Sequence, residues 1–413
     1  MRTSAANILF AERIAAIRPA ATLALSARAA ALKAEGFDIV NMGVGEPDFD
    51  TPALVRAAAK AAMDAGQTRY TPTAGTKALR EAVAAKLQRE NNLDYSADEV
   101  IVTTGGKQAI HNAIAALVDS GDEVLIPTPY WVTYADVTLL CEGVPRFLQT
   151  SIESGFRITA KQLEDAITPR SKVLFLNSPG NPSGAMYGED ELRAIGEVVR
   201  RHPQLAVISD DIYEHVLVGS KTMLNILNVC PDLASRTILV NGVSKAYAMT
   251  GWRLGFAASH RKLIEAMETV QSQTSGSPNT VSQAAAVSAL SNSASLIKPM
   301  APVYRARHRL LCDRLAGIQG LRFIPSEGSF YLFVNVADAI ANLGGAGVLK
   351  RQSDTAFSEY LLDNHGLAVV PGSAFGSPGH LRLSFATSDE QIIKACDRLS
   401  QACAAQTNSM DSK

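Results

Sequence analysis

Residues 242–255 read Gly-Val-Ser-Lys-Ala-Tyr-Ala-Met-Thr-Gly-Trp-Arg-Leu-Gly, and this is the most distinctive segment of the chain. It lies between two runs with the composition of β-strands, Thr237–Asn241 and Leu254–Ala258. Lys245 therefore stands just past a predicted strand end, directly after the hydroxyl residue Ser244. A lysine that is partly removed from water has a lowered pKa, and its neutral amine can form a Schiff base with an aldehyde.

Arg253 belongs to the turn that follows Lys245. Its planar guanidinium is suited to a phosphate group, which it can bind through two parallel hydrogen bonds. The alternative interpretation of residues 242–255 is a surface lysine beside a structural glycine turn. The other sequence motifs are needed to distinguish a reactive lysine from a surface lysine.

Short β-branched runs alternate with helical patterns between residues 97 and 260. The further predicted strands are Val100–Thr103, Glu123–Pro127, Lys172–Leu176 and Leu205–Ser209. Leu192, Ile195, Val198 and Val199 recur at helical spacing between two of these strands. Strands that alternate with helices predict an α/β fold, with a mostly parallel sheet covered on both faces.

A second, smaller domain is predicted after the sheet. A long helical segment runs from Leu263 to Leu315 and is interrupted around Ser275–Pro278. Three more strand-like runs follow it, at Phe330–Asn335, Ala368–Val370 and Leu381–Phe385. We therefore expect one large and one smaller domain, which suits a chain of 413 residues.

Polar residues gather at the carboxyl ends of the predicted strands. The four clusters are Gly105-Gly106-Lys107, Asn177–Gly184, Asp210–Tyr213 and Ser244-Lys245. Because ligands of parallel sheets bind outside these strand ends, the four loops predict one binding site.

Each cluster also has a simpler interpretation. The Gly105-Gly106 pair precedes a predicted helix, whose free N–H groups can hold a phosphate, but such pairs are common and no P-loop or dinucleotide fingerprint is present. The Asp210 carboxylate can keep a cationic ring nitrogen protonated, or it can cap a helix. Tyr213 can reach the same ligand or simply pack as an aromatic. Asn181 can present its amide to a ligand or belong to a tight turn.

Two further residues could belong to the same binding site. Trp131 can stack on a flat ring, although most tryptophans belong to a core. Arg382 lies in an apolar strand, and a buried arginine needs a carboxylate partner from the protein or from a substrate.

Composition excludes several classes of function. The net charge is −1, so no global field attracts nucleic acid or an anionic membrane. The five cysteines are scattered, without a C-x-x-C pair, and predict neither a zinc site nor a disulfide framework. The sequence has no apolar run of membrane-spanning length and no secretory signal pattern, so we expect a cytoplasmic protein without a metal.

Eight motifs occur in a fixed order along the chain. They are Gly45-Glu46-Pro47-Asp48-Phe49, Arg69-Tyr70-Thr71-Pro72, Thr104-Gly105-Gly106-Lys107-Gln108-Ala109, Pro129-Tyr130-Trp131, Asn181-Pro182-Ser183-Gly184, Asp210-x-x-Tyr213, Ser244-Lys245-x-x-x-Met249-x-Gly251-Trp252-Arg253 and Arg382-Leu383-Ser384. From about Arg13 to about Cys403, the chain resembles the class I aminotransferases of fold type I, and within them the bacterial aspartate aminotransferase branch.

The resemblance implies a fold, a cofactor and an assembly. The fold would be that of the fold-type I transferases, with residues 1–45 joining the small domain, residues 46–290 forming the large domain and residues 291–413 the small C-terminal domain. The cofactor would be pyridoxal 5′-phosphate, carried by Lys245 as a Schiff base. The protein would be a homodimer with shared active sites, and Tyr70 would reach the phosphate from the neighbouring subunit.

The resemblance also assigns roles to the residues singled out above. Asp210 would pair with the pyridine nitrogen, Tyr213 and Asn181 would bond the phenolic oxygen, and Trp131 would stack on the ring. The phosphate would be bound by Gly105, Gly106, Lys107, Ser244 and Arg253. Arg382 would bind the substrate α-carboxylate, helped by the Gly45 backbone and by Asn181 and Trp131.

The substrates implied are L-aspartate or L-glutamate with 2-oxoglutarate or oxaloacetate, in a ping-pong reaction. Lys107 would meet the distal carboxylate, and Arg18 is a second basic candidate. The animal-type branch takes its distal arginine from the region of Gln271–Gln283, where this chain has none. Prephenate or neutral and aromatic amino acids are alternative substrates. A lyase on the same fold, or a non-catalytic sensor that would need a DNA-binding extension, are alternative functions.

Overall fold

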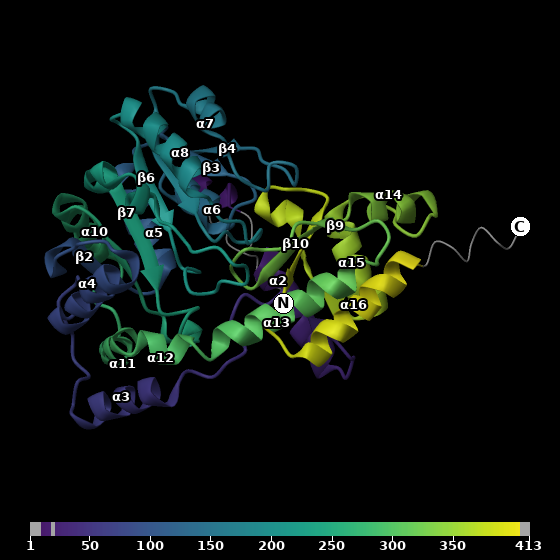
Figure 1. The fold of residues 1–413 in the computed structure, drawn as a ribbon, viewed down its shortest axis with the longest axis horizontal. Coiled ribbons are helices and arrows are strands. Elements are labelled where there is room, and N and C mark those ends of the chain that lie inside the picture. The colour runs from purple at the N-terminus through teal and green to yellow at the C-terminus, as the bar shows by residue number, and fades with distance from the viewer. Residues whose placement is uncertain (1–9, 18–20, 405–413) are drawn as a thin grey trace, which may run out of the picture.

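The computed structural model describes residues 10–17 and 21–404. Its largest element is a seven-stranded sheet between helices (Figure 1). In spatial order the strands are β2 (Val100–Thr103), β8 (Gly255–Ala258), β7 (Thr237–Gly242), β6 (Ala206–Asp210), β5 (Ser171–Asn177), β3 (Glu123–Pro127) and β4 (Val144–Leu148). Strand β8 runs antiparallel to both neighbours, and the other adjacent pairs are parallel. The mostly parallel sheet is therefore confirmed.

Helices cover both faces of this sheet. They are α3 (Ala53–Asp64), α4 (Lys77–Asn91), α5 (Gly106–Leu117), α6 (Thr133–Leu140), α7 (Ala160–Ala166), α8 (Glu189–Arg201), α9 (Ile226–Val229), α10 (Arg261–Thr274), α11 (Thr280–Ser291) and α12 (Ser293–Ile297), with short 3₁₀ turns η1 (Ala97–Glu99), η2 (Pro231–Arg236) and η3 (Thr250–Trp252). Successive strand residues alternate between the faces: Val173 and Phe175 join the core under α5, α6 and α10, whereas Leu174 and Leu176 join the core under α4, α8 and α11.

The strand β4 was not predicted. Four of its five residues, Val144–Phe147, are exposed or only partly buried at the edge of the sheet, and Pro145 interrupts the run. An edge strand of this kind lacks the apolar pattern by which buried strands are recognised. The six predicted strands of this sheet all occur, within two residues of their predicted ends.

The smaller part of the structure is built around an antiparallel sheet. Its strands lie in the order β12 (Val370–Pro371), β13 (His380–Ser384), β10 (Tyr331–Asn335) and β9 (Arg322–Phe323). Around it lie α13 (Met300–Leu315), α14 (Ala337–Gly345), α15 (Asp354–His365), α16 (Asp389–Ala404) and η4 (Gly372–Phe375), while α1 (Glu12–Ala15) and α2 (Ala21–Ala34) come from the start of the chain. Arg382 occupies β13, opposite Phe333 on one side and Val370 on the other.

A short strand near the start of the chain joins this smaller part. Strand β1 (Val40–Asn41) pairs in parallel with β11 (Leu367–Ala368), and the Ser384 amide donates a 2.7 Å hydrogen bond to the Met42 carbonyl. Residues 43–46 are thereby held between the two sheets. With two residues in each strand, β1 and β11 are too short to give a sequence pattern.

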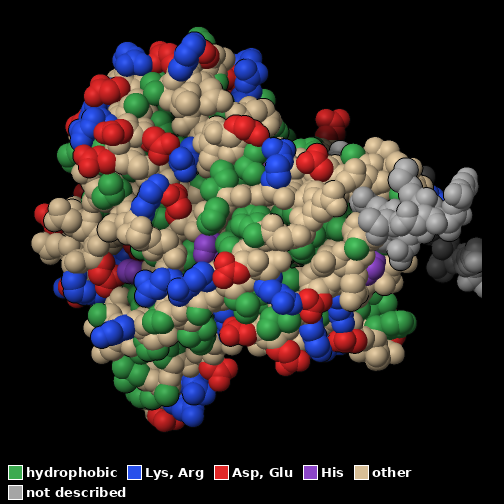
Figure 2. All heavy atoms as spheres, turned by 45° about the vertical axis from the view of Figure 1, so that its right-hand side comes forward, with side chains coloured by type: hydrophobic (Ala, Val, Ile, Leu, Met, Phe, Trp, Pro, Cys, Tyr) green, Lys and Arg blue, Asp and Glu red, His purple; other side chains and the backbone are tan. Residues whose placement is uncertain are grey.

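Charged groups are mixed on the molecular surface. On the face drawn in Figure 2, basic and acidic side chains are interspersed, in keeping with the net charge of −1. Among the described residues, the helices lack the combination of length and hydrophobicity that crossing a bilayer requires.

Gly255, at the start of β8, lies directly under the turn that leads from β2 into α5. A Cβ atom at this position would lie 2.6 Å from the Gly105 carbonyl carbon and closer still to the Gly106 nitrogen. Because these neighbours are backbone atoms, they cannot move aside as a flexible side chain could.

We predict that Gly255→Ala lowers the free energy of unfolding by about 1–3 kcal/mol, because the added methyl group displaces the turn before α5. Urea unfolding followed by circular dichroism measures the change. The matched control is Gly317→Ala, whose Cβ would have no atom within 4 Å. Equal unfolding midpoints for the two variants would contradict the close packing at Gly255.

Candidate active site

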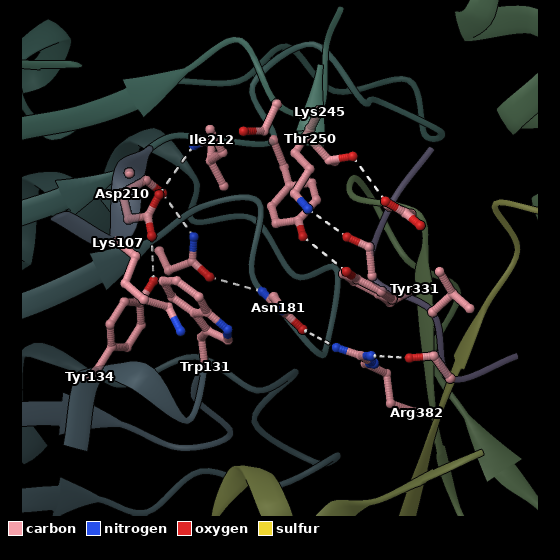
Figure 3. A pocket seen from close by; sticks show the side chains of 18 of the residues that line it. Lys107, Trp131, Tyr134, Asn181, Asp210, Ile212, Lys245, Thr250, Tyr331 and Arg382 are labelled. Carbon is pink, nitrogen blue, oxygen red and sulfur yellow. Dashed lines mark hydrogen bonds between the residues drawn. The ribbon is translucent and has the colours of Figure 1, made fainter. Parts of the chain in front are cut away.

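A cavity of about 470 Å³ lies at the carboxyl ends of the sheet strands. Figure 3 shows Lys107, Trp131, Tyr134 and Asp210 on one side of it, with Tyr331 and Arg382 on the other. The predicted site residues that line it are Gly45, Gly106, Lys107, Trp131, Asn181, Asp210, Tyr213, Ser244, Lys245, Arg253 and Arg382. The four predicted loops therefore converge, and the second sheet contributes Arg382.

Lys245 follows β7 and projects into the cavity. Its ammonium group donates a hydrogen bond to the Gly45 carbonyl and lies 5.9 and 5.8 Å from the ring centres of Tyr213 and Phe330. Burial, and next the positive charge of Arg382, lower the pKa of Lys245 to about 8. A substantial fraction of this amine is therefore neutral near physiological pH, as a nucleophile requires.

Asp210 ends β6 and is buried. Burial raises its pKa to about 6, although hydrogen bonds from the Tyr134 hydroxyl (2.7 Å) and the Ile212 amide (3.3 Å) act in the opposite direction. The carboxylate remains ionised at neutral pH, and a cation placed beside it would favour that form further. The site thus has a buried anion suited to a protonated ring nitrogen.

The start of α5 supplies hydrogen-bond donors for an anion. The first N–H groups of a helix have no acceptor within the helix, and this one starts at Gly106. Gly105 has a φ of +84°, and a Cβ there would lie 2.5 Å from the Arg253 guanidinium. Arg253 itself has a φ of +50°, a strained conformation for a residue with a side chain. Glycine at 105 leaves the space that the guanidinium occupies beside Ser244.

Lys107 points toward Trp131 from the first turn of α5. Its ammonium group lies 5.2 Å from the centre of the Trp131 ring, within the range of a cation–π contact. Burial and the neighbouring Arg253 lower the pKa of Lys107, and Asp136 partly offsets this. The Lys107 amine therefore lies on the wall of the cavity, next to the Trp131 ring.

Arg382 is 3% exposed, and among the described residues no acidic side chain forms an ion pair with it. Its guanidinium donates to the Asn181 side-chain oxygen (3.1 Å) and the Gly43 carbonyl (2.8 Å), and it lies 4.2 Å from the Tyr331 ring centre and 5.0 Å from that of Phe375. Its Nε atom is buried without a hydrogen-bond partner in the described part of the chain. A buried cation with an unused donor fits a carboxylate supplied by a ligand.

One predicted residue, Tyr70, does not take part in this cavity within one chain. The Tyr70 side chain is 99% exposed and lies outside it. Arg18 lies outside the described residues. Gly105 is present at the edge, behind Arg253 rather than in the lining.

Sequence reasoning missed two tyrosines in the cavity. The Tyr134 hydroxyl holds Asp210, and the Tyr331 hydroxyl lies 3.0 Å from that of Tyr213. Tyr134 stands three residues after Trp131 on the helical turn that begins α6, which is a signal that could have identified it. Tyr331 lies in an apolar strand far away in sequence, where nothing distinguishes it from a core aromatic.

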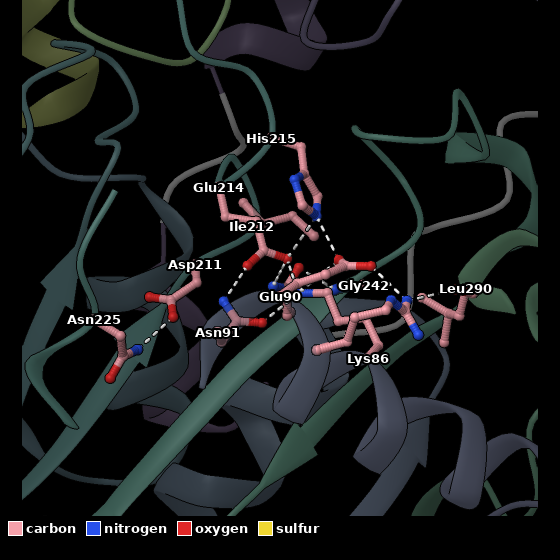
Figure 4. A network of polar contacts seen from close by, with 12 residues as sticks. Lys86, Glu90, Asn91, Asp211, Ile212, Glu214, His215, Asn225, Gly242 and Leu290 are labelled. Atoms are coloured by element: carbon pink, nitrogen blue, oxygen red, sulfur yellow. Dashed lines mark hydrogen bonds and ion pairs between the residues drawn. The ribbon is translucent and has the colours of Figure 1, made fainter. Parts of the chain in front are cut away.

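Beneath the segment that carries Asp210 and Tyr213 lies a buried polar network (Figure 4). Lys86, which is 1% exposed, contacts Glu214 and donates a 2.8 Å hydrogen bond to Asn91, whose amide in turn donates to Glu214 at 2.6 Å. Burial alone would raise the pKa of Glu214, but Lys86, His215 and hydrogen bonds outweigh burial and lower it. The network fixes the backbone just after the site.

The family model for aminotransferases of classes I and II matches residues 38–399. The chain is 47% identical to an aspartate/prephenate aminotransferase of Nitrosomonas europaea, across 94% of this chain and 98% of that protein. Among solved structures, an aspartate aminotransferase from Rhizobium meliloti has 44% identity and a TM-score of 0.91, over 96% of this chain and 99% of that one. The Thermus thermophilus aspartate aminotransferase with maleate has 39% identity and a TM-score of 0.89, over 96% and 100%.

We predict that Lys86→Met lowers the free energy of unfolding by about 3–5 kcal/mol at neutral pH, because Glu214 is left as a buried charge without its cation. In the variant, Glu214 loses the Lys86 charge that offsets its burial, while His215 and the hydrogen bond from Asn91 remain, so its pKa is higher than in wild type. Protonation at lower pH then relieves the cost, and the difference from wild type should shrink as the pH falls toward 4. Urea unfolding at several pH values measures this.

The control for this prediction is Lys77→Met on the same helix. Lys77 forms an exposed ion pair with Glu81 at 3.7 Å, and its loss should change stability by less than about 1 kcal/mol. Equal effects of the two substitutions, or a Lys86→Met effect independent of pH, would contradict the role of Glu214.

Proposed function

The chain belongs to the family of class I and II aminotransferases, and we propose that it uses pyridoxal 5′-phosphate bound at Lys245 to move the amino group between L-aspartate or L-glutamate and a 2-oxo acid. The activity class, transfer of an amino group between an amino acid and a 2-oxo acid, follows from the family. The observation that carries the rest is Lys245, a partly buried amine with its pKa lowered to about 8, between an anion and two sets of donors.

The residues present fit this cofactor. The helix start at Gly106, with Ser244 and Arg253, suits a phosphate, and the buried carboxylate of Asp210 suits a pyridinium nitrogen. Trp131 and the hydroxyl of Tyr213 line the space between them. When bound, pyridoxal phosphate supplies an aldehyde that condenses with amines and a protonated ring that accepts the electron pair released at the substrate Cα.

The chain's own groups perform three tasks in this reaction. Arg382 binds the substrate α-carboxylate and so orients the Cα–H bond. Asp210 keeps the ring nitrogen protonated through its negative charge. Lys245 would act as the general base that takes the proton from the substrate Cα and passes it on, as an amine with a pKa near the working pH can.

Lys107 supports a preference for acidic substrates. Its charge lies across the cavity from Arg382, above Trp131, where the second carboxylate of aspartate can reach it. The relatives are named for aspartate, and one of the solved structures contains maleate, which is a dicarboxylate. Several relatives are named for both aspartate and prephenate, so prephenate, another dicarboxylate, is the second candidate.

The assembly, the domain limits and the location stay predictions. We propose a homodimer because the side chain of Tyr70 is 99% exposed, so in a single chain it leaves the phosphate donors incomplete. The proposed division is residues 1–45, 46–290 and 291–413, in which β1 ties the first segment to the small domain. A cytoplasmic location is likewise a proposal.

We predict that Lys245→Ala folds normally but loses multiple turnover by at least about 10²–10⁴-fold, because it lacks the amine that carries the proton. Wild-type protein incubated with pyridoxal phosphate and borohydride should carry one adduct on the Lys245 peptide, detected by mass spectrometry. The exposed Lys262→Ala variant is the control and should behave as wild type. Colourless wild-type protein without an adduct would overturn the cofactor assignment.

Lys107→Ser should lower kcat/KM for aspartate by about 10–100-fold and leave phenylalanine turnover much less affected, because only the acidic substrate loses a charged hydrogen bond. Half-reaction kinetics with each amino acid measure the ratio. Lys107→Arg keeps the charge and should restore part of the preference. If both substrates are affected equally, Lys107 serves the phosphate rather than the distal carboxylate.

A further inference from the structure

The hydroxyl of Tyr331 has a position in the cavity that the reaction described above does not use. It lies 3.0 Å from the Tyr213 hydroxyl, and both side chains are buried. A Cβ atom on Gly45 would come within 3.1 Å of the Tyr331 oxygen, so the glycine leaves this hydroxyl its space. Tyr331 therefore sits between the proposed cofactor site and the proposed carboxylate site.

The ring of Tyr331 is held on several sides. The Arg382 guanidinium lies over it at 4.2 Å, and the rings of Tyr213 and Phe330 meet it edge to face at 5.7 and 4.8 Å between centres. Its backbone pairs with Ser384 across β10 and β13. A side chain fixed in this way can keep a hydrogen bond in one geometry without losing further rotational freedom.

Each tyrosine hydroxyl has a single proton, and this determines which of Tyr213 and Tyr331 donates the hydrogen bond between them. A tyrosine hydroxyl has one proton to donate and can also accept. If Tyr213 gives its proton to the phenolic oxygen of the cofactor, its contact with Tyr331 requires Tyr331 to be the donor. A hydroxyl that accepts such a bond becomes a better donor itself, because hydrogen bonds in a chain polarise one another.

We propose that Tyr331 is a positioning residue that donates to Tyr213 and thereby strengthens the hydrogen bond from Tyr213 to the phenolic oxygen of the cofactor. This inference rests on the proposed function, since it needs the cofactor at Lys245. Burial raises the pKa of Tyr331, and the charge of Arg382 only partly offsets this rise, so the Tyr331 hydroxyl keeps its proton and can donate it.

The test is a double-mutant cycle read by spectroscopy on the cofactor-loaded protein. The visible absorbance of the Lys245–cofactor linkage changes with pH, and its midpoint falls when the phenolate is stabilised by a donor. Tyr331→Phe should raise this midpoint by roughly 0.3–0.5 unit, and Tyr213→Phe by about one unit. In the double variant the midpoint should equal that of Tyr213→Phe, because Tyr331 acts only through Tyr213.

A matched control separates this role from a general effect on packing. Tyr304 packs on the same Phe330, and its buried hydroxyl has no hydrogen-bond partner in the described part of the chain. Tyr304→Phe should leave the midpoint unchanged. The charged groups that act on Lys245, namely Arg382, Glu46, Arg253 and Asp210, are intact in every variant. Thermal unfolding of each variant checks that the fold is kept.

The outcomes separate this inference from the function on which it rests. An unchanged midpoint in Tyr331→Phe, an equal rise in Tyr304→Phe, or the same increment with and without Tyr213 would overturn the role of Tyr331 and leave the aminotransferase proposal standing. Wild-type protein without any Lys245-dependent absorbance would overturn both.

Discussion

Removing the Lys245 ammonium group from water is the constraint on which the rest of the cavity depends. An ammonium group removed from water is costly unless its surroundings share the charge, and in the described part of the chain its hydrogen-bond acceptor is the Gly45 carbonyl. Burial lowers the pKa of Lys245, and the positive charges of Arg382 and Arg253 lower it further. The negative charges of Glu46 and Asp210 partly offset this lowering. The surroundings that lower the pKa of Lys245 thus include two arginines, Arg382 and Arg253, that can bind anions.

The charged side chains of the cavity, Arg382 and Asp210, are held in place by neighbouring groups. Arg382 rests on aromatic rings and neutral carbonyl groups rather than on a carboxylate, which leaves its charge available. Asp210 is oriented by Tyr134, and the residues after it are fixed by Glu214 and Lys86 below. The two charged groups Asp210 and Arg382, which face the cavity, are therefore held by neutral partners.

Most of this arrangement could be predicted from the sequence, for identifiable reasons. Strands such as Val100–Thr103 are apolar and short, and the residues after them are polar, so both the sheet and its functional edge could be predicted. Lys245 and Arg382 were identifiable from their motifs. Their proximity followed only from the family resemblance, because it depends on how β13 meets the strand ends, and no local pattern encodes that.

Three of the residues that were missed share one property. Tyr331, Lys86 and Glu214 each act through a partner more than a hundred positions away, and each sits in a segment that looks ordinary by itself. Strand β4 was missed for a different reason, since its exposed edge lacks the buried pattern. Local sequence patterns thus identify side chains that face a ligand more readily than side chains whose role is to contact other side chains.

The antiparallel strand β8 also has a consequence for how the chain folds. It pairs Val100 with Ala258 and brings Gly255 beneath the Gly105-Gly106 turn, so this turn packs on a strand that is synthesised long after it. Contacts between such distant segments form slowly, because a large loop must close first. A nascent chain that lacks β8 therefore lacks the strand on which the start of α5 packs, and the turn can reach its final form only after residue 255 has left the ribosome.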